Sequence, residues 1–111
     1  MVEVDRGSEA VVGDRPLVRD VYPEFSPKLV SALEADGEHE LAIAAGDLRV
    51  VAPCRCNDEF CQSFYTAPRP NGPYGAGHRN VMPDFDTGMV VLDVVHGRIM
   101  FVEILGQPPL C

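Results

Sequence analysis

Apolar residues in the first half of the chain recur at helical spacing. In "DRPLVRDVY" they fall at i, i+1, i+4 and i+5, which predicts a short helix that the following Pro23 ends. "SPKLVSALEADG" predicts a second helix, capped by Ser26, with Pro27 at its first position and Gly37 at its end. "EHELAIAAG" predicts a third helix from His39 to Ala45, closed by glycine.

From residue 48 onwards the pattern favours β-strands, because β-branched and aromatic residues occur in short runs. The predicted strands are 48–53, 62–67, 88–95 and 98–105, with a further short extended piece at 80–82. Helices followed by antiparallel strands are typical of the α+β class. We therefore expect one domain, residues 1–111, with residues 1–13 as a loose arm. Two or three N-terminal helices should pack on an antiparallel β-meander of about four strands.

The last two predicted strands form a hairpin. His96-Gly97 joins them as a tight turn in which the glycine supplies positive φ. A two-residue loop places Val94 opposite Ile99 and Leu92 opposite Phe101. Both faces of the hairpin are mostly apolar, which predicts either a central pair of strands in the sheet or cover on both sides by helices or by a second subunit.

Two acidic residues, Asp93 and Glu103, interrupt this apolar hairpin. A buried carboxylate needs a partner, and Arg98 or Arg49 is available. The simpler interpretation is that both acidic side chains lie at a solvent-exposed edge of the sheet.

The composition and net charge of the chain limit the classes of function that it fits. The 111 residues include 17 acidic and nine basic side chains, for a net charge of −8. Nucleic-acid binding is disfavoured, because it requires clustered Lys and Arg to displace counterions. The sequence contains no apolar segment long enough to span a membrane and starts without a secretory signal, which predicts a cytoplasmic protein. An acidic surface suits solubility, or a basic protein partner.

The segment "CRCNDEFC" places Cys54, Cys56 and Cys61 within eight residues. With His78 as fourth ligand they form a candidate zinc site, because Zn²⁺ prefers four tetrahedral sulfur or nitrogen ligands. C-x-C differs from the usual C-x₂-C spacing, and Cys111 is an alternative fourth ligand. A thiol-dependent oxidoreductase is a further alternative, although C-x-x-C is missing. The simplest interpretation is that the cysteines pack in a turn.

A loop of about twenty residues, 68–88, holds four Pro and four Gly and precedes the final hairpin. Loops this long inside compact domains are uncommon and tend to be functional. "GPYGAGHRN" lacks the third glycine of a dinucleotide-binding fingerprint. We therefore expect a binding loop that presents Tyr74, His78, Arg79 and Asn80, or alternatively a connection stiffened by proline.

"CRCNDEFCQSFYTAP", "GHRNV" and the terminal "GMVVLDVVHGRIMFVEIL" resemble a group of small uncharacterised proteins of high-GC bacteria, over roughly residues 48–105. The resemblance implies a β-meander that ends in a hairpin and no assigned activity. The function hypothesis is a small cytoplasmic, non-enzymatic binding protein that acts through a protein partner or as a homo-oligomer. An immunity- or antitoxin-like inhibitor is one example. The alternative hypothesis is a small zinc-binding protein, with zinc as its cofactor.

Overall fold

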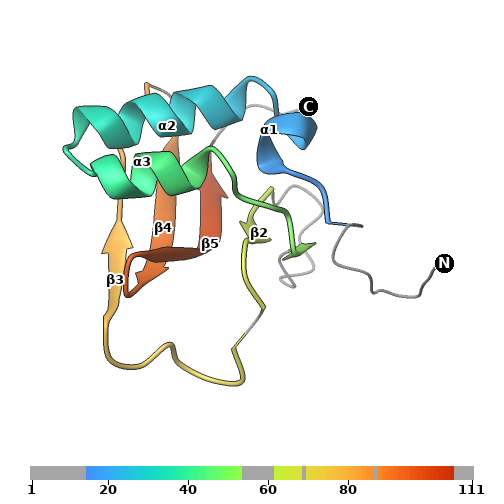
Figure 1. The fold of residues 1–111 in the computed structure, drawn as a ribbon, viewed down its shortest axis with the longest axis vertical. Helices are drawn as coiled ribbons and strands as arrows, with labels where there is room; N and C mark the ends of the chain where they lie inside the picture. Colours follow the sequence, from blue (N-terminus) through green and yellow to red (C-terminus); the bar gives the residue numbers. More distant parts are fainter. Residues whose placement is uncertain (1–14, 54–61, 69, 87, 107–111) are drawn as a thin grey trace, which may run out of the picture.

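The computed structural model describes residues 15–53, 62–68, 70–86 and 88–106. Three helices precede five strands: α1 (Val18–Val21), α2 (Phe25–Ala35), α3 (His39–Ala45), β1 (Ala52–Pro53), β2 (Phe64–Tyr65), β3 (His78–Val81), β4 (Met89–Val95) and β5 (Arg98–Leu105). The helices lie together on one face of an antiparallel sheet (Figure 1). This arrangement confirms the predicted α+β class with N-terminal helices on a sheet.

The helices follow the apolar spacing. The predicted bounds of α3 are confirmed, and Gly37 ends the α2 region with φ +80°, the left-handed conformation expected of a terminating glycine. The predicted start of α2 is wrong, because the helix begins at Phe25 and Ser26 lies buried in its first turn. Burial of the Phe25 ring against Phe85 favours this earlier start. None of the described helices is long and apolar enough to cross a bilayer.

The predicted strands 48–53 and 62–67 shrink to two residues each, β1 and β2. The backbone at 48–50 instead bonds to the start of α1 and the residues before it: Val18 N–H donates to Leu48 O, and Val50 N–H donates to Pro16 O, each at 2.8 Å. In contrast, the short piece expected at 80–82 is a four-residue strand, β3, at 78–81. Over the described residues the sheet therefore has five strands, where the sequence predicts about four.

The strand order is β1-β2-β5-β4-β3. Strands β3, β4 and β5 follow one another as a meander, and the β4–β5 hairpin is central, as predicted. Strand β2 pairs with β5 and not with the next strand along the chain. Residues 70–77 therefore lead across the sheet to β3 on its other side, as the yellow segment in Figure 1 shows.

The β4–β5 hairpin contains a β-bulge. His96 and Gly97 have φ of 50° and 80°, and Val94 pairs with Ile99 as predicted. Beyond that pair the register shifts, so Leu92 lies opposite Val102 and the predicted pairing with Phe101 is wrong. Simple alternation from Ile99 would have turned Phe101 and Glu103 toward the helices. The extra residue reverses the alternation and places Val102 and Ile104 in the core.

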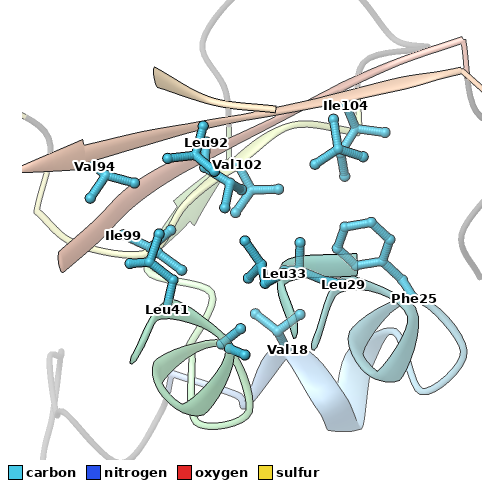
Figure 2. Close-up of a cluster of buried hydrophobic side chains, with 14 of the residues drawn as sticks. Val18, Phe25, Leu29, Leu33, Leu41, Leu92, Val94, Ile99, Val102 and Ile104 are labelled. Atoms are coloured by element: carbon cyan, nitrogen blue, oxygen red, sulfur yellow. The ribbon is translucent and has the colours of Figure 1, made fainter. Parts of the chain in front are cut away.

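The core lies between the helices and one sheet face. Figure 2 shows side chains of the helices pointing toward those of β4 and β5. The large side chains with less than 2% exposure are Leu29, Leu33, Leu41, Leu92, Ile99, Val18, Val90, Val94 and Val102. Burial of this apolar surface is the main force that holds the helices on the sheet.

Candidate functional site

The sheet face opposite the described helices is named the open face here. Strand pairing places on it Tyr65, His78, Asn80, Val91, Asp93, Val95, Phe101 and Glu103. Most of these side chains are partly exposed, whereas their neighbours along β4 and β5 that face the helices are buried. The open face therefore presents polar and aromatic groups at the centre of the sheet.

Asp93 is the polar centre of the open face. Its side chain is 21% exposed, and its Oδ1 lies 2.7 Å from His78 Nε2. Asn80 Nδ2 donates to the same oxygen, also at 2.7 Å. Because a carboxylate only accepts hydrogen bonds, His78 carries a proton on Nε2. Neither Arg98 nor Arg49, the two partners considered for a buried Asp93, bonds to it: pairing of β3 with β4 brings an imidazole and an amide to it instead.

Tyr74, in the loop before β3, packs against this polar group. Its ring centroid lies 4.9 Å from that of His78. Burial raises the pKa of the Tyr74 phenol, and the nearby charges of Asp93 and ionised Tyr65 raise this pKa further. Both causes favour the protonated form of the Tyr74 hydroxyl.

A hollow of about 440 Å³ lies beside Asp93 on the open face. It is named the aromatic hollow and is lined by Tyr65, Phe101, Tyr74, Asp93 and the loop residues Pro70, Asn71, Gly72 and Pro73. Tyr65 and Phe101 are cross-strand partners whose ring centroids lie 4.4 Å apart. The bulge in β5 positions Phe101 for this contact, so the bulge is part of the site.

The structure brings together three of the four residues expected in the binding loop. Tyr74, His78 and Asn80 surround Asp93, whereas Arg79 is separated from them by the alternation of β3. Both Nη atoms of Arg79 donate to the Glu38 carboxylate at 3.0 Å, between α2 and α3. The hydrogen bond from Arg79 lowers the pKa of Glu38. Arg79 therefore ties the helices to the sheet.

The zinc hypothesis stays a prediction, because Cys54, Cys56 and Cys61 lie outside the described residues. Its fourth ligand, His78, has Nε2 engaged by Asp93. Over the described part of the chain, no group of three or more His, Cys, Asp or Glu side chains is close enough to hold a metal ion. The thiol-oxidoreductase hypothesis also rests on the cysteines and stays a prediction.

Sequence reasoning did not select three residues of this site: Asp93, Tyr65 and Phe101. The i, i+2 spacing of His78 and Asn80 was a usable signal, because two such residues on a strand share a face. For Phe101 the local pattern points to the wrong face, since the bulge reverses it.

The aromatic hollow has the chemistry of an organic-cation site. Both hydrogen bonds to Asp93 end on Oδ1, and no donor among the described residues reaches Oδ2. The faces of Tyr and Phe rings carry negative charge density and attract ammonium and guanidinium groups. A cation in the hollow would therefore meet aromatic rings and a carboxylate oxygen together.

Comparison of the chain with protein-family models, with curated proteins and with solved structures found no match. What the aromatic hollow binds is therefore inferred from its own side chains.

Proposed function

We propose that this protein is a non-enzymatic binding protein that takes a basic segment of a protein partner onto its open face. A Lys or Arg side chain of the partner occupies the aromatic hollow. The observation that carries this proposal is the convergence of Tyr65, Tyr74, Phe101 and the Asp93 carboxylate on one hollow of about 440 Å³.

Arginine is the better fit of the two cations. A guanidinium is planar, stacks on aromatic rings and donates N–H groups in a fork that matches a carboxylate. One cation–π contact contributes about 0.5–1 kcal/mol at an exposed site and more when water is excluded. His78 and Asn80 hold Oδ1 of Asp93 from one side, so its second oxygen is already oriented when the cation arrives.

The charge of the whole chain supports the same partner. A net charge of −8 attracts a basic protein over long range and repels an acidic one. An immunity- or antitoxin-like protein that neutralises a basic toxin is one concrete version of this function. Binding should weaken as salt is raised, because the Debye length falls from about 10 Å at 0.1 M to about 3 Å at 1 M.

The test uses the full chain and a single-residue probe. The amide signals of ¹⁵N-labelled protein are recorded while N-acetyl-arginine-methylamide is added, with N-acetyl-glutamate-methylamide as the opposite-charge control. We expect saturable shifts at Tyr65, Tyr74 and Phe101 with the arginine probe alone. Asp93→Asn should abolish them, since its amide oxygen can still accept from His78 and Asn80 while the negative charge is lost.

Asp84→Asn is the matched control, because Asp84 is an exposed acid that does not line the hollow. Equal binding to the wild type and Asp93→Asn would overturn the proposal. A second copy of the chain is the competing occupant of the open face, and sedimentation velocity measures this self-association. A dimer that Phe101→Ala dissociates would assign the open face to a second copy and overturn the basic-partner proposal.

A further inference from the structure

A second hollow, of about 520 Å³, lies between the end of α3, the residues before α1 and the start of β5. It is named the arginine hollow, because Arg15, Arg49 and Arg98 all line it. Apolar side chains of Leu48, Val51 and Ile99 form much of the remaining wall, with Ala44, Asp47, Thr66, Pro68 and Gly97. None of these residues belongs to the aromatic hollow.

Three arginine residues in the lining of one hollow are unexpected in this chain. Only nine of its residues are Lys or Arg and its net charge is −8, yet three of the nine line one hollow. No carboxylate of a described residue lies within ion-pair distance of Arg15, Arg49 or Arg98. Three arginines thus line one hollow with no counterion among the described residues, which favours an anion supplied from outside.

The only acid in the described lining, Asp47, is already engaged. Arg19 Nη1 lies 3.0 Å from its Oδ1 and donates to Gly46 O at the same distance. The acid therefore does not neutralise the three arginines of the hollow. Arg49 is held in place, because its Nη1 donates to the backbone oxygen of Arg15 at 2.7 Å. Its other side-chain N–H groups make no hydrogen bond to a described residue and can donate to a ligand.

We propose that the arginine hollow binds a small organic anion, with its carboxylate or phosphate group on Arg15, Arg49 and Arg98. The guanidinium fork matches the oxygens of either group with two parallel hydrogen bonds. The apolar wall of Leu48, Val51 and Ile99 suits the organic part of such a molecule, and the volume falls in the range of small-molecule sites. This inference does not depend on the proposed function, because the two hollows share no residue.

The test titrates ¹⁵N-labelled full-length protein with inorganic phosphate and, separately, with sodium benzoate, at ionic strength kept constant with sodium chloride. We expect saturable amide shifts at Leu48, Gly97 and Arg98. Saturation by both anions assigns an oxyanion site. Saturation by phosphate alone identifies a phosphate ligand, and saturation by benzoate alone identifies an organic carboxylate.

Arg98→Gln and Arg49→Gln should each weaken the affinity about tenfold or more, since each removes charge-assisted hydrogen bonds. Arg79→Gln is the matched control and should bind as the wild type does, because its partner is Glu38. The side chains of Arg49 and Arg98 are both exposed, and Arg98 makes no side-chain hydrogen bond to a described residue, so Arg98→Gln should fold normally. The proposal is overturned if neither anion gives saturable shifts, or if all three variants bind alike.

Discussion

The ends of β4 and β5 meet at a close backbone approach that requires glycine. Gly88, just before β4, has φ +69°, and a Cβ built on it would overlap the carbonyl oxygen of Leu105. The same Cβ would lie 2.7 Å from C and O of Gly106, well inside the 3.4 Å at which ordinary contact begins. All three obstructing atoms belong to the backbone, so they cannot move aside by a side-chain rotation. Gly88→Ala should therefore destabilise the protein.

Gly37→Ala supplies a matched comparison. Gly37 has φ +80°, close to that of Gly88, but a Cβ there has no atom within 4 Å. The left-handed conformation costs an alanine roughly 1–2 kcal/mol, and about 0.4–1 kcal/mol of this is offset by the stiffer unfolded chain. Gly37→Ala should thus cost about 1 kcal/mol. Gly88→Ala adds an overpacking cost of about 1–3 kcal/mol, for a total of about 2–4 kcal/mol.

Urea unfolding followed by far-ultraviolet circular dichroism measures both variants, with the free energy of unfolding obtained by linear extrapolation. The difference between the two variants isolates the steric term, because the conformational term is shared. If Gly88→Ala is as stable as Gly37→Ala, the two strand ends do not approach as described. The reasoning is then refuted, and with it the pairing of Met89 with Leu105.

Three further predictions follow from buried or paired side chains. The buried Ser63 Oγ accepts a hydrogen bond from the backbone N–H of Ile104 in β5 at 2.8 Å. Ser63→Ala should therefore lower the free energy of unfolding by about 1–3 kcal/mol, and an unchanged midpoint of urea unfolding would contradict this contact. Leu33 is fully buried, and Leu33→Ala should cost about 2–5 kcal/mol, whereas Ile43→Ala, at a 73% exposed position, should change little. Arg79→Gln should raise the pKa of Glu38 back toward 4.5 in a carbon-detected NMR titration. Because the pKa of Glu38 is lowered in the folded protein, the Glu38–Arg79 pair contributes stability above pH 4.5, and this stability is lost as pH falls through the folded-state pKa. Arg79→Gln should remove that pH dependence of stability.

Features set by neighbouring residues were predictable from the sequence. The bounds of α3, the left-handed Gly37 and the tight turn at His96-Gly97 all agree with the structure. Each depends on periodicity or on backbone freedom within a few positions of the chain. The start of α2 was mispredicted for the opposite reason, because Phe25 enters the helix to pack on Phe85, sixty residues away in sequence.

The strands were predicted less well, because pairing partners are chosen over long separations. The pattern at residues 48–50 predicts a strand, yet Leu48 and Val50 bond through their backbone to Val18, at the start of α1, and to Pro16. Strand β3 lies in a region rich in Pro and Gly, and its pairing with β4 makes it regular. A short stretch of sequence around residues 48–50 or around β3 does not contain the segment with which it pairs.

For the candidate site, the sequence by itself determined the acidic charge and the presence of Tyr74, His78 and Asn80 in one unusual loop. Only the tertiary structure decided that these residues meet Asp93, because β3 pairs with β4 after the loop has crossed the sheet. It also decided that Phe101 joins Tyr65 on the open face, since the bulge keeps Val102 and Ile104 in the core. The physical reason is that apolar burial and backbone hydrogen bonding select strand register across the whole sheet, and the open face follows from that selection.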